Sequence, residues 1–590
     1  MNKEVKYLYG GIIFGILAII GVTYAFFSAS IVGDRKNVSV DMTDLKIIFT
    51  NGDAIEANDI SAEDNLDIVK SFSVENKTKN DYKYNIVIES LLNTFKTSGY
   101  LVYKITSNDG GYNMTEFADV PKRSTASDTV LAYSINVPAK SIHNYNIEIK
   151  YINSETENQS ADSNATLSGK LFIGKGTPMP TLAEAMLRDN PTISERTDFD
   201  VTFTENTTGT IYKTNKTEDG STVYYYSGNT TNNWVMFGKE TITSCTYNGE
   251  QVQYGIYDNE IDDYKGVRRV ASSEECVSTN VCLSNDYGPI IGLTEEQCDN
   301  VGSTWTTDKA TAGSKAEKDI YWRIIRTNED KSIRVLYSGT SPDTTKSYIR
   351  ASSFNSANND PMYVGYMYGT TGTLANNRTN TNDSTIKKYI DSWYKDNLLT
   401  NYDKYISKTA IYCNDRSVPN NDYSTSEKFD YGAYTRFNNY TPTYKCGGNG
   451  TDGLFETTQS TADKFSVSTD GGGNGQLKYP IALMTADEIV FAGGHANTVL
   501  SSSHAWYVVN SKGNAISNAS LWSLSPYGWD NSGAYVWNVG GFAFPDHLSG
   551  DYVQLGGGVR PSVSLASCVG IKSGNGTPES PYEIDESSCS

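Results

Sequence analysis

Hydrophobic and polar residues follow three different patterns along the chain, and the first is an apolar run near the N-terminus. Between Lys6 and Asp34 no residue is charged, and this stretch is longer than the ~20 residues that a helix needs to cross a bilayer. Because Lys3 and Lys6 precede it, we expect the N-terminus to stay in the cytoplasm. Residues 1–33 are therefore predicted to be a transmembrane segment or, as the close alternative, a signal peptide that is cleaved after Ala25.

The second pattern is strict alternation of apolar and polar positions in residues 34–175. In YNIVIES (84–90) and YNIEIKY (145–151) every second residue is apolar, which is typical of a half-buried strand. Loops rich in Asn, Gly and Ser separate several such runs. The pattern predicts a β-sandwich of antiparallel sheets with polar outer faces.

Residues 176–230 are polar, and they are predicted to form a linker. Thr181 and Glu184 have the spacing of a capping box, and Pro191 ends the short helix that they begin. The Thr- and Asn-rich residues that follow are typical of a flexible stalk that holds the next domain away from the surface.

The third pattern mixes strands and helices, and it predicts an α+β domain over residues 231–590. Residues 232–238 and 320–339 are apolar and β-branched, so we expect them in one sheet. Apolar residues recur at helical spacing after Ser384, and a second helix is expected between Thr485 and Gly493. Glu488 completes a capping box with Thr485, so we interpret it and Asp487 as helix-capping and dipole residues.

Residues 240–318 interrupt this domain with a polar, loop-rich insertion that lacks an apolar core of its own. The insertion carries four of the eight cysteines, and two disulfides would hold it together. Structural zinc is the alternative, but no CxxC pair is present to bind it. An even number of cysteines favours disulfides in an oxidising compartment, with unpaired thiols as the alternative. The eight are Cys245, Cys276, Cys282, Cys298, Cys413, Cys446, Cys568 and Cys589.

The run from Leu521 to Pro561 holds three of the chain's eight Trp residues and no Lys, Arg or Glu before Arg560. Aromatic rings with Ser, Gly and Asn are the mixture that favours a contact surface. The alternative interpretation is a buried, β-rich core with Gly turns. The composition of the whole chain excludes one partner, because 49 Lys and Arg against 69 Asp and Glu leave a net charge of −20 and no basic face for nucleic acid.

The N-terminal part resembles a known family. The motif TYAFFSAS (23–30) directly before a strand-rich domain is similar to the camelysin/TasA-type surface and biofilm-matrix proteins of Gram-positive bacteria, over roughly the first 175 residues. The resemblance implies cleavage after Ala25. Some relatives are metallopeptidases, but this domain has no HExxH motif and its only histidine is His143, so zinc hydrolysis is not expected.

The C-terminal part resembles a second family through YWRIIR, IDSWYKDNL, IYCNDRS, KYPIALMTADEIVFAGG, LWSLSP, GVRPSVSL and GNGTPESPYEI. Over about residues 231–585 it is similar to an extracellular domain of unknown function in gut Firmicutes. We place this domain near the C-type-lectin-like fold of formylglycine-generating enzymes and of the variable proteins of diversity-generating retroelements. The resemblance implies a ligand face built from the long loops before the final strands, here Tyr527 to Gln554. It also raises the hypothesis that this segment is hypervariable.

The enzyme branch of that fold binds copper through two cysteines. Here Cys413 and Cys446 are expected to form a disulfide instead, and Cys568 and Cys589 to form another. Trp529-Asp530-Asn531 is similar to the calcium tripeptide of lectins, but no accompanying Glu-Pro-Asn-like loop is present. The histidines His495, His504 and His547 have no second ligand at a suitable spacing. No metal, cofactor or catalytic residue is therefore predicted.

These observations predict a non-catalytic protein of the cell membrane's outer face or of the secreted surface layer, with a lectin-like head that binds a glycan or a surface protein. A structural matrix or fibre subunit that self-associates is the alternative, and an enzyme on the formylglycine-generating scaffold is a third hypothesis. The predicted ligand-binding residues are Tyr527, Trp529, Asp530, Asn531, Tyr535, Trp537, Asn538, Phe544, His547, Asp551 and Tyr552.

Overall fold

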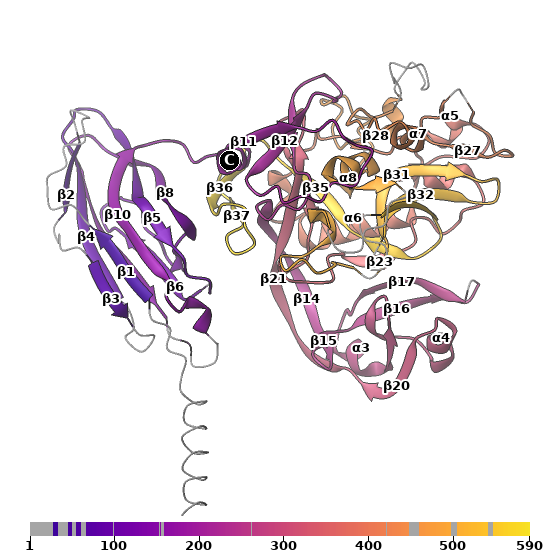
Figure 1. The fold of residues 1–590 in the computed structure, drawn as a ribbon, viewed down its shortest axis with the longest axis horizontal. Helices are drawn as coiled ribbons and strands as arrows, with labels where there is room; N and C mark the ends of the chain where they lie inside the picture. The colour runs from indigo at the N-terminus through magenta and orange to yellow at the C-terminus, as the bar shows by residue number, and fades with distance from the viewer. Residues whose placement is uncertain are drawn as a thin grey trace, which may run out of the picture. The chain divides into compact units, whose positions relative to one another are not determined.

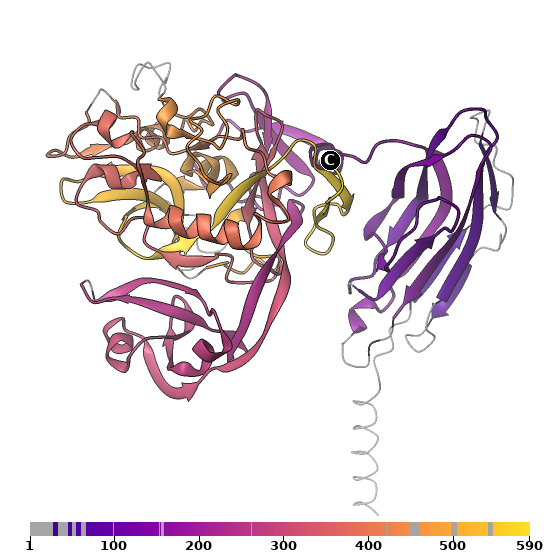
Figure 2. The same ribbon diagram turned by 180° about the vertical axis from the view of Figure 1, so that it is seen from behind.

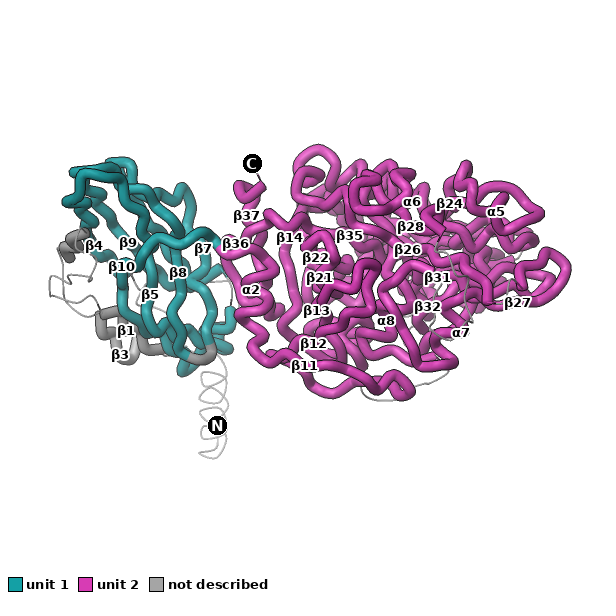
Figure 3. Tube along the Cα trace, turned by 90° about the horizontal axis from the view of Figure 1, so that it is seen from above, with its two compact units in different colours: residues 1–179 teal, residues 180–590 magenta. Residues whose placement is uncertain are grey.

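The computed structural model divides the chain into two compact units, residues 1–179 and 180–590 (Figure 3). The described residues are 27–32, 45–49, 55–60, 67–97, 99–152, 154, 159–260, 262–419, 422–447, 460–496, 504–517, 519–540 and 547–589. Among these residues, no helix combines the length and the apolar character needed to cross a membrane. Residues 27–32 of the predicted N-terminal segment 1–33 form a strand that pairs within a sheet, so the prediction is wrong for this part. The rest of the segment, its cleavage position after Ala25 and the candidate Phe544 lie outside the described residues.

Unit 1 is a β-sandwich, as its alternating pattern predicts (Figure 1). One sheet has the order β3 (Ile55–Ile60), β1 (Phe27–Val32), β10 (Thr166–Lys175), β5 (Tyr82–Asn93) and β8 (Arg123–Val137). The other has the order β2 (Leu45–Phe49), β4 (Asp67–Asn76), β9 (Ile142–Tyr151), β6 (Leu101–Thr106) and β7 (Ala118–Asp119). Every second residue of β9 is buried, and Phe72, Ile86, Ile147 and Leu171 from the two sheets share one core.

The tract predicted as a stalk belongs instead to a sheet of unit 2. The predicted capping box is confirmed, because Thr181 and Glu184 begin α2 (Leu182–Asp189). Beyond it lie β11 (Thr192–Glu195), β12 (Thr210–Thr214) and β13 (Val223–Tyr225). Ile211, Val223 and Tyr225 of these strands are fully buried. The prediction of a flexible stalk is therefore wrong, because a few apolar residues in this polar tract pack into a core.

The first sheet of unit 2 is built on two long antiparallel strands, β14 (Trp234–Tyr247) and β21 (Thr311–Thr327). The hairpin partner of β21 is β22 (Ile333–Tyr337), so the expectation that residues 232–238 and 320–339 share a sheet is confirmed. The other members are β11, β12, β13, β15 (Glu250–Gln251), β29 (Ile481–Leu483), β35 (Pro561–Leu565), β36 (Gly570–Ser573) and β37 (Tyr582–Asp585).

The second sheet runs from the cysteine-bearing insertion into the body of the unit. Its order is β20 (Thr304–Lys309), β18 (Asn280–Ser284), β19 (Gly288–Ile291), β16 (Gln253–Asp258), β17 (Asp263–Arg269), β23 (Arg350–Ser352), β34 (Gly557–Val559), β31 (Leu521–Trp529), β32 (Ala534–Val539), β33 (His547–Tyr552) and β30 (His495–Ala496), with β27 (Phe429–Asp430) beside β31. The prediction of an insertion without its own core is wrong. Val252, Val281 and Ile291 lie in one small core there, and Ile290 and Leu293 lie in another that the insertion shares with residues of the body such as Leu521.

The insertion forms a distinct lobe at the end of β14 and β21 (Figures 1 and 2). It also contains α3 (Ser273–Ser278) and α4 (Glu295–Asn300). Two disulfides, Cys245–Cys276 and Cys282–Cys298, hold it together. The other four cysteines form Cys413–Cys446 and Cys568–Cys589, as the second resemblance implies.

The predicted helices of unit 2 are confirmed. Ser384 caps α6 (Thr385–Asn397), while Thr485 and Glu488 form the capping box of α8 (Ala486–Ala492), which ends at Gly493. The remaining elements are α5 (Leu374–Asn377), α7 (Gly432–Asn438) and the strand pairs β24 (Met367–Tyr368) with β25 (Asn382–Asp383) and β26 (Tyr412–Cys413) with β28 (Lys464–Phe465).

Candidate functional site

The predicted ligand-binding segment forms a three-stranded antiparallel meander, not a long display loop. β32 pairs with β31 on one side and with β33 on the other. Tyr535 lies opposite Tyr552, and Trp537 lies opposite Gly550. The prediction that residues 527–554 form a loop outside the framework strands is wrong, because most of this segment is itself part of the sheet.

The candidates lie on both faces of this meander, since side chains alternate along a strand. Asn538 lies opposite Ser549 on one face, and its Nδ2 donates to Oδ2 of Asp551 at 2.6 Å. Burial raises the pKa of Asp551, although the bond from Asn538 opposes the shift. His547 shares this face by register, and burial lowers its pKa. Tyr535, Trp537 and Tyr552 lie on the other, aromatic face by register, and the ring of Tyr527 packs against Trp537 there. One ligand therefore cannot contact the whole predicted set.

Three of the predicted contact residues are buried. Trp529 is 5% exposed and Trp537 is 2% exposed, and Asn538 is also buried. Helix α7 covers Trp537, with the ring of Phe437 at 5.1 Å and that of Tyr434 at 6.2 Å between centroids. The expectation that these three residues lie on the outer surface is therefore wrong, and the core interpretation holds for them.

Half-buried tyrosines remain on the aromatic face, and we call Tyr434, Tyr527, Tyr535 and Tyr552 the tyrosine face. The centroid distances are 5.1 Å from Tyr434 to Tyr527, 6.0 Å from Tyr527 to Tyr535, and 4.2 Å from Tyr535 to Tyr552. Gly550 leaves the room for this packing, because a Cβ there would lie 2.5 Å from the Tyr527 ring. No pattern in the sequence predicts that Tyr434 belongs to this face, because the residue lies far from the meander along the chain.

Asp530 fixes the edge of the tyrosine face from the β31–β32 turn. Its carboxylate accepts hydrogen bonds from the hydroxyls of Tyr535 (2.6 Å) and Tyr552 (3.1 Å). It also accepts from the backbone N–H groups of Ser532 (2.9 Å) and Gly533 (2.8 Å) and from the Ser532 hydroxyl (2.7 Å). Asn531, the next residue in this turn, is exposed and has a left-handed φ of 67°.

These contacts determine which groups of the site are charged. Burial opposes ionisation of Asp530, but the hydrogen bonds from Tyr535, Ser532 and Gly533 hold the pKa of its carboxyl well below the usual range. Burial and the neighbouring Tyr434 raise the pKa of Tyr527 to about 12. At neutral pH Tyr527 is therefore a neutral phenol, and Asp530 is a carboxylate.

The carboxylate of Asp530 accepts hydrogen bonds from Ser532 and Gly533 of its own turn, whereas the carboxylate of a lectin calcium ligand would face the ion. Among the described residues, no three His, Cys, Asp or Glu side chains are grouped so that they could hold a metal. His143 of unit 1 is buried, and its Nδ1 lies 2.9 Å from the hydroxyl of Tyr84.

Buried ion pairs lie behind the meander, and the sequence analysis missed them. Glu488 receives hydrogen bonds from Arg326 (2.9 Å) and Arg334 (3.0 Å) besides capping α8. Asp487 pairs with Arg436 at 2.6 Å. No local signal predicts these pairs, because 154 and 162 residues separate Glu488 from its two partners.

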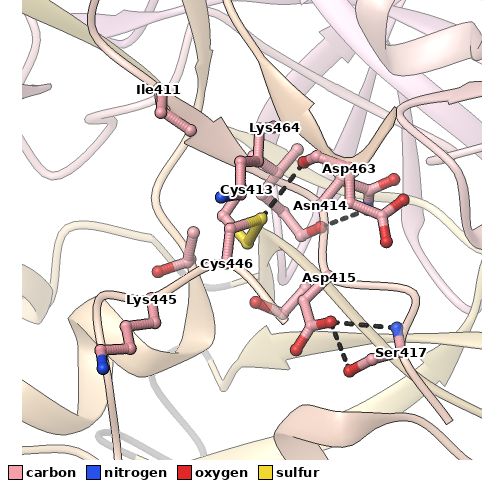
Figure 4. The surroundings of a disulfide bond; sticks show 12 residues. Ile411, Cys413, Asn414, Asp415, Ser417, Lys445, Cys446, Asp463 and Lys464 are labelled. Carbon is pink, nitrogen blue, oxygen red and sulfur yellow. Dashed lines mark hydrogen bonds between the residues drawn. A yellow bond between two sulfur atoms is a disulfide. The ribbon is translucent and has the colours of Figure 1, made fainter. Parts of the chain in front are cut away.

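Cys413 lines the same small cavity as Asp487 and Glu488, and Figure 4 shows the surroundings of its disulfide with Cys446. Sγ of Cys446 is 3.3 Å from the carbonyl oxygen of Asp463, which also accepts from the backbone N–H of Asn414 at 3.0 Å. The neighbouring Asp415 accepts from Ser417 and from Arg436. The two cysteines thus join buried segments and are not available as a pair of free thiols.

Tyr527, Tyr535 and Tyr552 of the tyrosine face remain accessible for contact with a ligand, as do the predicted residues Asn531, His547 and Asp551. Comparison of the chain with protein families, with curated proteins and with solved structures finds no match.

Proposed function

We propose that the chain is a non-catalytic cell-surface protein that binds a glycan or a surface protein through the tyrosine face. The observation that carries this proposal is the rigid arrangement of Tyr527, Tyr535 and Tyr552, with two of their hydroxyls bonded to Asp530. Half-buried phenol rings offer apolar stacking area and polar edges at low rotamer cost. Preorganisation lowers the entropy lost on binding.

A lectin-like head is the finer part of this proposal. The GVRP motif supports it, because β34 belongs to the second sheet and β35 to the first. Between them Arg560 is buried, and its Nε donates to the carbonyl oxygen of Tyr337 at 2.6 Å. The motif thus fastens the two sheets together behind the meander, as a framework for a binding face requires.

A location outside the cytoplasm is part of the same proposal. Four disulfides support it, since they persist in oxidising compartments. The apolar residues that precede β1, from Tyr7 to Phe26, are proposed to anchor the chain in the membrane or to direct its export.

The test is a screen of the full chain against saccharide and surface-protein arrays, with variants of the tyrosine face. Tyr527→Ala is expected to weaken binding at least about tenfold, since aromatic anchors dominate interfaces. Tyr257→Ala in the cysteine-bearing lobe is the matched control and is expected to bind normally. Trp537→Ala is expected to unfold unit 2. Unchanged binding by Tyr527→Ala would refute the assignment, and fibre assembly without ligand binding would favour the structural alternative.

A further inference from the structure

A cavity opens where the cysteine-bearing lobe joins the body of unit 2, and its lining residues are remote in sequence from the meander. Its volume is about 350 Å³, within the range of small-molecule sites. We call it the arginine pocket. Its charged lining residues are Arg268, Arg269, Lys315, Arg350, Glu240 and Asp396. Four cationic side chains thus face two carboxylates, in a chain whose net charge is −20.

Two of these arginines lie directly opposite each other. Arg268 of β17 is the cross-strand neighbour of Arg350 of β23 in an antiparallel pair. Like charges at such positions repel and destabilise the sheet. Arg268 is compensated, because it forms an ion pair with Glu275 and lies 4.1 Å from the ring centroid of Tyr254.

Arg350 shares the aromatic contact but has no carboxylate partner among the described residues. Its guanidinium lies 3.3 Å from the centroid of the Tyr389 ring, and its buried Nε has no hydrogen-bond acceptor there. Burial, together with the charge of Arg268, lowers the pKa of Arg350 to about 10, although Tyr389 opposes the shift. A buried Nε–H without an acceptor is costly, so it favours an anion from outside.

The carboxylates of the pocket do not meet this need. Glu240 is buried, and it already binds Arg269, the indole Nε1 of Trp393 (2.8 Å) and the hydroxyl of Tyr337 (2.7 Å). Asp396 lines the pocket, but it is exposed on α6 and no ion pair joins it to Arg350 within the described part of the chain. Lys315 is also exposed at the rim and adds a second cation.

We propose that the arginine pocket is an oxyanion-binding site, in which Arg350 and Lys315 hold a carboxylate, sulfate or phosphate group of a small ligand. The planar guanidinium forms paired hydrogen bonds with such groups, and the lysine contributes as a point charge. Tyr389 and Ile349 supply an apolar wall beside them, so the rest of the ligand can be uncharged. This site is independent of the tyrosine face, and its success or failure leaves the proposed function untouched.

The experiment measures thermal unfolding of the full chain at neutral pH with millimolar sodium sulfate, phosphate or acetate, each compared with sodium chloride of equal ionic strength. An anion that binds only the folded state raises the melting temperature of unit 2, and the rise grows with the logarithm of 1 + [anion]/Kd. We expect a rise with at least one of the three, and the anion that gives the largest rise identifies the acid group of the ligand.

Variants separate specific binding from the general stabilising effect of salts. Arg350→Gln is expected to abolish the rise, and Lys315→Gln, at an exposed position that leaves the fold intact, is expected to reduce it. Arg188→Gln, which removes an exposed arginine outside the pocket, is the matched control and should keep the full rise. The proposal would be overturned if no anion raised the melting temperature of unit 2 in the unmodified chain. It would also be overturned if Arg350→Gln and Lys315→Gln showed the same rise as the unmodified chain.

Discussion

At the scale of single residues, Asp530 makes the stability of unit 2 fall at acid pH. Hydrogen bonds hold its pKa in the folded state below the ordinary value of about 4 in the unfolded chain. Its contribution is therefore complete above about pH 4 and is lost as the pH falls toward the folded-state pKa. We predict that Asp530→Asn lowers the urea midpoint at neutral pH and reduces the loss of stability between about pH 5 and pH 3. Asp470→Asn, in an exposed loop, is the control, and an equal effect of both variants would contradict the prediction.

The second residue-scale prediction concerns Glu488, which compensates two buried arginines. Although burial opposes ionisation, Arg334 and Arg326 hold the pKa of Glu488 below its usual range. Glu488→Gln leaves Arg334 without a carboxylate and leaves Arg326 with Glu329 alone, at 3.6 Å, so we expect a loss of about 3–5 kcal/mol in the free energy of unfolding. Denaturant titration checks this, with Glu427→Gln at an exposed position as the control. A loss below about 1 kcal/mol would mean that water or other groups solvate the arginines.

These two residues also show what could be predicted from local sequence. The spacing of Thr485 and Glu488 was enough to predict a capping box and the start of α8, because both partners lie within one turn. The ion pairs of Glu488 depend on how distant strands fold together, so spacing contains no information about them. The same limit hid Tyr434 and Arg350, whose roles come from neighbours brought close only by the sheet.

At the scale of elements, the meander was mistaken for a loop because its composition resembles one. Gly and Ser residues between the aromatic positions weaken the alternating pattern, and β31 departs from regular pairing near Pro526. Gly550 is instead needed for packing, because only a residue without a Cβ leaves room for the Tyr527 ring. We predict that Gly550→Ala displaces the Tyr527 ring and costs about 1–3 kcal/mol, since over-packing forces neighbours out of place. Near-ultraviolet circular dichroism and urea unfolding measure both effects. Gly174→Ala in β10, where the nearest atom would be 3.6 Å away, is expected to be close to neutral.

At the scale of the whole molecule, the sandwich of unit 1 followed from the sequence and the second resemblance implied two of the four disulfides, whereas the division of unit 2 into sheets could not be predicted. The alternation in residues 34–175 was enough to predict a sandwich, because each strand there buries one face. Residues 192–225 lack such a pattern, and they are strands because β13 pairs with β21, about a hundred residues later in the chain. A local sequence pattern cannot predict strands that form only because a partner distant in the chain pairs with them.

The distribution of cysteines leads to the last prediction. All eight lie in unit 2, and their four disulfides close loops with sequence separations of 31, 16, 33 and 21 residues. In the chain-entropy account, each such loop contributes about 3 kcal/mol by restricting the unfolded state. We therefore expect a reductant to lower the melting temperature of unit 2 by on the order of 10 °C and to leave that of unit 1 unchanged. Scanning calorimetry of the full chain with and without the reductant resolves the two transitions. Unit 1 is the internal control, because it has no disulfide to lose; a parallel fall in both melting temperatures would mean that the two units do not unfold independently.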